Sequence, residues 1–276
     1  MAKKILFAQK YGFCFGVKRA VEALEKNKGK AYTLGPIIHN PLLVKAYKNR
    51  GIFPINDLDK IPPGTKVYIR AHGVANKIIK KGVKAGIDFV DLTCPFVKKS
   101  QILAHSLENK GYKVVIIGKK NHPEIMAIAG NLKSPMVISG LKEIKKIKNI
   151  KRLGIVCQTT SNIEKTAEIV TTIKKINPSA VIFNTVCQAT KERQAAAVTL
   201  AKKTDLVIVV GGKNSSNTKK LKEICSNYTP TYQIEDEKSL KEKWFTNKKI
   251  IGLTAGASTP DWIIRKVFDI IKKLPN

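Results

Sequence analysis

Three cysteines occupy the same local setting in different thirds of the chain. Cys14, Cys94 and Cys187 each end a short apolar run and open a pattern of helical periodicity, in ILFAQKYGFCFGVKRA, FVDLTCPFVKKS and AVIFNTVCQATKER. A thiol at the carboxyl end of a strand lies where open α/β sheets bind their ligands. Iron–sulfur clusters accept thiolates from separate elements, and three thiolates leave one iron open. The pattern therefore suggests a metal cluster with three protein ligands.

The cysteines also have other interpretations. Three small buried thiols that follow strands would show the same spacing. Zinc sites with three thiolates usually include a closely spaced pair, which this chain lacks. The chain has no CxxC pair and no secretion signal, which argues against a disulfide scaffold and for a reducing compartment. The remaining Cys157 and Cys225 are expected to be buried apolar side chains.

Polar loops follow several of the expected strands. His39, His72 and His122 lie in such loops, and imidazoles suit a phosphate or diphosphate. A single loop histidine is more often a solvated or capping residue, but three at equivalent places favour a ligand-binding role. Glu124 follows His122 and Pro123 at an expected helix start, where capping is the alternative role. In a closed site Glu124 could pass protons to a leaving hydroxyl, directly or through Thr159.

Hydroxyl and amide groups recur in the same kind of loop. The segment GGKNSSN predicts a helix start whose free N–H groups would bind an anion. The same residues also suit a plain N-cap. The polar groups expected to line a common cavity are Thr159, Thr160, Ser215, Ser216, Asn217 and Ser258. No GxGxxG follows a strand, so a nicotinamide or flavin cofactor has no support and electrons would come from a separate donor protein.

Strand and helix patterns alternate along the chain, which predicts an α/β fold of mostly parallel sheets. The expected strands are ILFA, AYTLG, VYIRA, DFVDL, VVIIG, MVISG, LGIVC, VIFNTV, LVIVVGG, YQIE and IIGLTA. The clearest expected helices are 96–109, 162–176, 188–203 and 260–273.

A weak internal repeat divides the chain into three similar units. The distance from Cys94 to Gly118 is 24 residues, and the distance from Cys187 to Gly211 is the same. We expect three pseudo-equivalent α/β units in a trefoil-like arrangement around a central cavity. Their expected ranges are 12–92, 93–179 and 180–276, with strand 1–11 joining the third unit.

The composition limits the class of protein. The chain has 276 residues and a formal net charge of +31. This charge first suggests nucleic-acid binding, but the lysines are spread along the whole chain, so a nucleic-acid partner is not expected. The longest apolar runs have strand length, which indicates no membrane span. These features predict a cytoplasmic protein.

Several segments, taken in order, resemble a known family. YGFCFGVKRA, IIHN, RAHGV, DLTCP, GKKNHPE, CQTTS, TVCQATKERQ, GGKNSSN and TAGASTPD are similar to the signature segments of 4-hydroxy-3-methylbut-2-enyl diphosphate reductases. The resemblance implies a trefoil of three α/β domains around one [4Fe–4S] cluster held by Cys14, Cys94 and Cys187. It implies Glu124 as proton donor, with Thr159 beside it. The implied substrate contacts are His39, His72, His122, Thr159, Ser215, Ser216, Asn217 and Ser258.

The reaction that the resemblance implies is a reductive dehydroxylation of an allylic diphosphate to isopentenyl and dimethylallyl diphosphate. The implied partner is an electron donor such as ferredoxin or flavodoxin. Two other hypotheses remain at this stage: a basic nucleic-acid-binding protein, and a zinc hydrolase that acts on phosphorylated metabolites.

Overall fold

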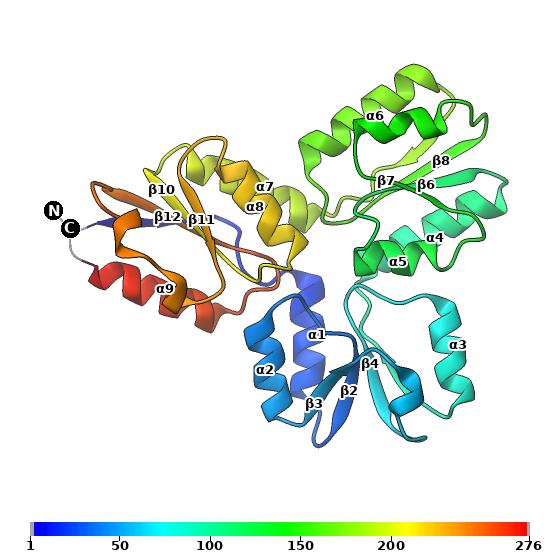
Figure 1. The fold of residues 1–276 in the computed structure, drawn as a ribbon, viewed down its shortest axis with the longest axis horizontal. Helices are drawn as coiled ribbons and strands as arrows, with labels where there is room; N and C mark the ends of the chain where they lie inside the picture. The colour runs from blue at the N-terminus through cyan, green and yellow to red at the C-terminus, as the bar shows by residue number, and fades with distance from the viewer. Residues whose placement is uncertain (1–2, 275–276) are drawn as a thin grey trace. The chain divides into compact units, whose positions relative to one another are not determined.

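A computed structural model describes residues 3–274, and its strands form three four-stranded parallel sheets (Figure 1). The chain divides into two compact units. The first unit comprises Met1–Lys18, His39–Lys45 and Gln188–Asn276, and the second comprises Arg19–Ile38 and Ala46–Cys187. The first unit contains one sheet and the second contains two. The α/β class with three repeated parallel sheets is thus confirmed.

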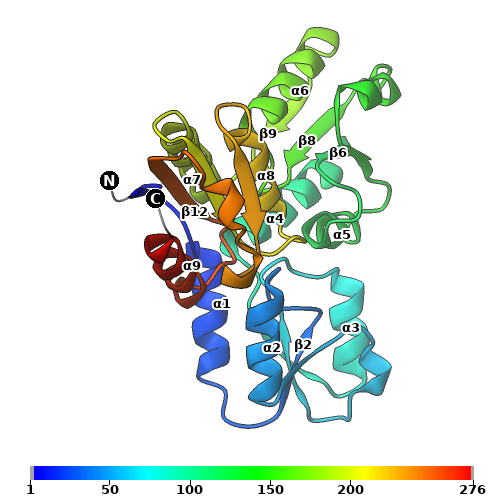
Figure 2. The ribbon, with the colours of Figure 1, turned by 60° about the vertical axis from the view of Figure 1, so that its left-hand side comes forward.

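The sheet of the first unit is covered on both faces. Its strand order is β1 (Lys4–Phe7), β12 (Ile250–Ala255), β10 (Leu206–Val210) and β11 (Thr231–Ile234). Helix α9 (Asp261–Lys273) packs on one face, against Ile208 of β10. Helices α7 (Gln188–Ala201) and α8 (Ser216–Cys225) pack on the other, against Val207 and Val209 (Figures 1 and 2). Strand β10 has the continuously apolar sequence LVIVV because both of its faces are buried.

The second unit holds the other two sheets. The first has the order β3 (Ile52–Ile55), β2 (Ala31–Leu34), β4 (Lys66–Ile69) and β5 (Asp88–Asp91). The second has the order β7 (Met136–Ile138), β6 (Lys113–Ile117), β8 (Leu153–Cys157) and β9 (Val181–Phe183).

The remaining helices connect these strands. Their bounds are α1 (Phe15–Glu25), α2 (Pro41–Asn49), α3 (Asn76–Lys84), α4 (Pro95–Asn109), α5 (Pro123–Ala129) and α6 (Ile163–Ile176). Short 3-10 helices are η1 (Leu58–Lys60), η2 (Leu141–Ile147), η3 (Glu237–Ser239) and η4 (Glu242–Trp244). The four helices expected from periodicity are confirmed, with ends within two residues of those predicted.

The three sheets follow one plan. A strand, β2, β6 or β10, leads through a polar loop to a helix, α2, α5 or α8. The next two strands flank it, and a fourth strand closes the edge of the sheet. That edge strand is β5 in one sheet and β9 in another, and the N-terminal β1 takes this place in the third. Because all strands of a sheet run parallel, their carboxyl ends and the loops that follow lie along one edge of that sheet.

One strand was missed by the sequence pattern. Strand β3 has the sequence IFPI, and a proline within a short apolar run argues against a strand. The structure accommodates Pro54 because β3 lies at the edge of its sheet and, among residues 3–274, pairs with β2 alone. A missing N–H is tolerated where it does not interrupt a ladder on both sides.

None of the helices within residues 3–274 combines the length and the apolar character needed to cross a membrane. The trefoil arrangement around a cavity and the domain ranges stay predictions from the sequence.

Candidate functional site

The three predicted cysteine ligands share one structural position. Each directly precedes a helix: Cys14 precedes α1, Cys94 is the N-cap of α4, and Cys187 precedes α7. All three side chains are partly exposed. The first turn of a helix has unpaired N–H groups and the positive end of the helix dipole, which favour a negatively charged group.

Each of these cysteines is also tied to a loop of the neighbouring strand. The backbone N–H of Cys94 donates to the carbonyl of Ala71 at 2.9 Å, in the loop after β4. The N–H of Cys187 donates to Thr159 at 3.0 Å, in the loop after β8, and that of Cys14 donates to Ala257 at 3.3 Å, after β12. The same contact therefore recurs in all three sheets. Thr159 itself provides the accepting carbonyl, and His72 and Ser258 directly follow the residues that provide it in the other two sheets.

The other two cysteines have a different environment. Cys157 lies in β8 and Cys225 ends α8, and both are fully buried. Burial raises the pKa of each thiol to about 12, so both stay neutral at physiological pH. The prediction that these two are structural is confirmed.

Two arginines hold the segments that precede Cys14 and Cys94. Arg193 of α7 is buried, and its Nη2 donates to the carbonyls of Gly12 at 3.1 Å and Phe13 at 2.9 Å. Arg19 of α1 donates from Nη2 to the carbonyl of Thr93 at 2.6 Å. In both cases the guanidinium binds the carbonyl directly before a predicted ligand.

No motif in the sequence pointed to Arg19 or Arg193. The available signal was composition, because the chain has only six arginines among 51 basic residues. Where lysine supplies almost all of the positive charge, an arginine indicates a site that needs a planar group with several hydrogen-bond donors.

Replacing Arg193 with Met is expected to lower the free energy of unfolding by about 3 kcal/mol, because two backbone carbonyls lose a charged donor. Chemical denaturation measures this loss. Alkylation of Cys14 in the metal-free protein should also become faster, since its segment is no longer held. The matched control is Lys203→Met at an exposed position beyond the same helix. An equal effect of both substitutions on Cys14 alkylation would contradict this role.

Glu124 is enclosed at the start of α5. Its side chain is 1% exposed, and the Thr159 backbone N–H donates to Oε1 at 2.6 Å while the Thr159 hydroxyl donates to Oε2 at 2.7 Å. Burial raises the pKa of Glu124 from 4.5 to about 7, against the opposing effect of the two hydrogen bonds. A carboxyl group with this pKa can hold and release a proton near neutral pH.

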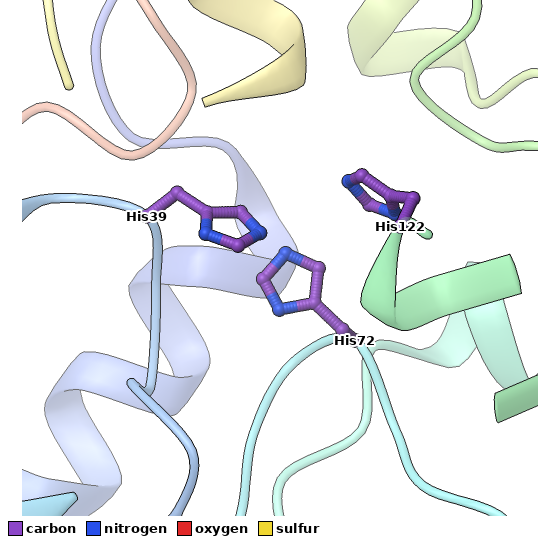
Figure 3. A group of neighbouring side chains, drawn as sticks. All are labelled: His39, His72 and His122. Carbon is purple, nitrogen blue, oxygen red and sulfur yellow. The ribbon is translucent and has the colours of Figure 1, made fainter. Parts of the chain in front are cut away.

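His122 is oriented by the same helix start. It is the N-cap of α5, and its Nδ1 accepts from the Glu124 N–H at 3.2 Å. In the neutral ring Nε2 therefore carries the proton and can donate to a ligand. The ring centroid of His72 lies 5.5 Å from that of His122, at an interplanar angle of 76° (Figure 3). Figure 3 also labels His39, from the loop before α2.

The first unit contains a group of buried hydroxyls at the start of α8. Ser215 is the N-cap, and its Oγ accepts from the Thr218 N–H at 3.2 Å. Ser258 donates to the His39 carbonyl at 3.3 Å and lies 3.4 Å from the Ser215 hydroxyl. Gly212 is required beside them, because a Cβ there would lie 2.5 Å from the His39 carbonyl oxygen.

Asn217 is the most informative member of this group. Its side chain is 4% exposed, yet neither amide atom finds a hydrogen-bond partner among the described residues, 3–274. Buried polar groups are nearly always paired, so an unpaired one calls for an explanation such as a ligand. Asn217 lies with the buried Ser215 and Ser216 at the N-terminus of α8, and helix N-termini are places where proteins commonly bind anions.

The predicted residues thus fall into two connected groups. In the second unit, contacts run from Cys94 to Ala71, beside His72, and on through His122, Glu124 and Thr159 to Cys187. In the first unit, the group contains Cys14, His39, Ser215, Ser216, Asn217 and Ser258.

Comparison with known proteins shows the family to which this chain is similar. A family model described as LytB protein matches residues 5–272. Proteins named 4-hydroxy-3-methylbut-2-enyl diphosphate reductase from Thermoanaerobacter sp. (strain X514) and Geobacter sulfurreducens are each 42% identical to this chain. The alignments cover 98% and 99% of this chain and 96% and 98% of the two relatives.

Solved structures agree with this result. A structure of (E)-4-hydroxy-3-methyl-but-2-enyl diphosphate reductase, described as the terminal enzyme of the non-mevalonate pathway, is 41% identical with a TM-score of 0.72, and the match covers 98% of this chain and 99% of that one. The E-1-hydroxy-2-methyl-but-2-enyl-4-diphosphate reductase from Plasmodium falciparum is 29% identical with a TM-score of 0.94, over 100% and 90% of the two chains.

The resemblance seen in the ordered sequence segments is confirmed by these matches. Because the family model extends over residues 5–272 and several relatives are about 42% identical over nearly their full length, this chain belongs to the LytB family.

Proposed function

We propose that this chain reduces 4-hydroxy-3-methylbut-2-enyl diphosphate to isopentenyl and dimethylallyl diphosphate. The observation that carries the proposal is the run of contacts in the second unit that links Cys94 to Cys187 through His72, His122, Glu124 and Thr159. Residues that suit proton transfer are thereby connected to the backbone of two of the three cysteines that we propose as metal ligands. The names of the relatives supply the substrate.

The cysteines fit a [4Fe–4S] cluster by their chemistry. Cys14, Cys94 and Cys187 are partly exposed thiols at helix starts, whereas Cys157 and Cys225 are sealed in the core. A thiol must be accessible to ligate a metal, and these three are accessible whereas the two core thiols are not. We assign the first three as ligands of one cluster per chain. When bound, the cluster supplies electrons singly and an iron with an open position.

The other residues bind the substrate and move protons. In our proposal, the hydroxyls of Ser215, Ser216 and Ser258 and the amide of Asn217 bind the diphosphate, together with the N–H groups of α8. The imidazoles of His39, His72 and His122 are further donors to its oxygens.

Glu124 is proposed as the acid that protonates the departing hydroxyl, and Thr159 holds its carboxyl group in place. The overall reaction consumes two electrons and two protons and releases one water. An external one-electron donor supplies the electrons.

The test is anaerobic purification followed by electron paramagnetic resonance of the reduced protein with and without the allylic diphosphate. We expect about four irons per chain, a spectrum that changes on addition of the diphosphate, and formation of the two isomeric products. A colourless protein that contains only zinc and turns over without reductant would contradict the proposal and favour a hydrolase.

Replacing Asn217 with Ala should weaken substrate binding without destabilising the fold. We expect KM to rise roughly 10-fold or more, because a buried amide that pairs with the ligand is lost. The free energy of unfolding of the substrate-free protein should stay equal or increase, since the removed amide has no partner within the described part of the chain. Steady-state kinetics and urea denaturation measure the two effects.

The matched control for this substitution is Asn227→Ala, at an exposed position after the same helix. It should change neither KM nor stability. A large stability loss with unchanged KM in Asn217→Ala would show that Asn217 is a structural residue.

A further inference from the structure

A hollow of about 550 Å³ in the first unit takes no part in the two groups described above. It is formed by β1, the segment that follows it, the start of α1 and α9. Its lining residues are Phe7, Tyr11, Phe13, Lys18, Asp261, Ile264, Arg265 and Phe268. The volume lies within the range of sites that hold small organic ligands.

Aromatic rings form one side of the hollow. The ring centroid of Phe7 lies 5.2 Å from that of Tyr11 and 5.4 Å from that of Phe268, with interplanar angles of 30° and 37°. Phe7 and Tyr11 are 38% and 37% exposed, which is unusual for large apolar side chains placed side by side. Such a surface suits another flat aromatic group, which can pack against the exposed rings.

The charges around the hollow are mostly positive. Lys18 and Arg265 are exposed at its rim, and Asp261 is the acid in the lining. Next to lining residues in the sequence, Lys10 and Lys266 are exposed bases and Asp269 is an exposed acid. Aromatic side chains together with arginine are the composition of a protein-binding surface. The excess of positive charge favours an acidic partner and accelerates its approach at low salt.

The wall of the hollow leads directly to a proposed cluster ligand. Phe13 lines the hollow and is bonded to Cys14, and the carbonyls of Gly12 and Phe13 are held by Arg193. Gly12 has φ of +67°, and a Cβ there would lie 3.3 Å from Ile264 Cδ1. The backbone between the hollow and Cys14 is therefore short and firmly held.

From these observations we infer that the hollow is the docking surface for an acidic flavoprotein that donates electrons, with the exposed edge of its flavin against Phe7 and Tyr11. The inference rests on the proposed function, which needs two electrons from outside the chain. Each docking event passes one electron, so two events supply the two electrons, and two protons from the solvent complete the balance with release of one water.

The experiment uses the iron-loaded protein of 276 residues and compares its turnover with three reductants. Reduced flavodoxin is the acidic flavoprotein probe, a reduced acidic ferredoxin is a carrier without a flavin ring, and reduced methyl viologen is a small donor that needs no docking surface. The variants are Arg265→Glu and Tyr11→Ser. The controls on the opposite face of the sheet are Lys222→Glu in α8 and Tyr228→Ser, both at exposed positions.

We expect Arg265→Glu to lower the flavodoxin-driven rate constant at least 10-fold at low salt. We expect Tyr11→Ser to lower it at least 5-fold, with a smaller loss for ferredoxin. Turnover with methyl viologen should be unchanged in both variants, which also shows that they fold. Neither control should alter any of the three rates.

Three outcomes would contradict the inference. The first is an unchanged flavodoxin-driven rate in both variants, and the second is no turnover of the wild type with flavodoxin despite turnover with methyl viologen. The third is an equal loss of the ferredoxin-driven and flavodoxin-driven rates in Tyr11→Ser, which would show that Tyr11 does not contact a flavin. A wild type that fails even with methyl viologen overturns the proposed function instead, so the two failures are distinguishable.

Discussion

Replacing Glu124 with Gln is expected to lower kcat by roughly 10²- to 10⁴-fold, the usual contribution of a positioned acid. The substitution conserves the shape of the side chain and its contacts. The Gln oxygen can accept from the Thr159 N–H, and its NH₂ group can donate to the Thr159 hydroxyl, which replaces both hydrogen bonds of the carboxyl group. The lost property is the proton, so KM should change little. Steady-state kinetics with a small reductant measures both constants.

The same substitution should change how stability depends on pH. The pKa of Glu124 is about 7 in the folded protein and 4.5 ordinarily, so the folded state binds this proton more tightly. The free energy of unfolding of the wild type therefore falls as pH rises from about 4.5 through 7, because the buried group becomes charged. Glu124→Gln avoids this loss and should be more stable than the wild type at pH 8, by up to about 3 kcal/mol.

Activity should have a matching dependence on pH. If the protonated form of Glu124 is required, wild-type kcat falls as pH rises through about 7, and this descending limb is absent from the residual activity of Glu124→Gln. The control is Glu164→Gln, since Glu164 occupies the second position of α6, as Glu124 does in α5, but is exposed. If Glu124→Gln were as active as the wild type, Glu124 would be excluded as the proton donor.

Replacing any one of Cys14, Cys94 or Cys187 with Ser should reduce the iron content to less than half of the wild-type value and abolish turnover. A three-thiolate set has no spare ligand, and a serine hydroxyl is a poor substitute for a thiolate. The measurements are iron and sulfide analysis and the visible absorption of anaerobically purified protein. The result does not depend on catalytic rates, so it separates cluster assembly from chemistry.

Cys157→Ala and Cys225→Ala are the controls within the same chain. Both thiols are buried and neutral, with a pKa of about 12. Their removal should leave the iron content unchanged and cost about 1–2 kcal/mol of stability through the small cavity formed. Full iron content in Cys94→Ser, or iron loss in Cys157→Ala, would require a different ligand set.

Local patterns were sufficient for the class of fold. Short stretches of sequence were enough to predict the alternating strands and helices, the repeated cysteine position and the polar loops. This is because side-chain periodicity and turn chemistry are local properties of the chain. The exception was β3, which was not predicted because it contains Pro54. A proline is tolerated there because pairing with β2 places β3 at the edge of the sheet. A helix N-cap within GGKNSSN was likewise predicted from the sequence, and the structure assigns it to Ser215.

The chemistry of individual groups was decided by tertiary structure. The sequence by itself determined which residue types occur at strand ends, and therefore the candidate ligands and acid. Only packing decided that Glu124 is sealed from water and bound by Thr159, 35 residues away, and these contacts set its pKa. Arg193 reaches carbonyls 180 and 181 residues away, and no local pattern encodes that distance. Burial and partner choice arise when remote segments exclude water together, which is why they follow from the fold and not from the spacing.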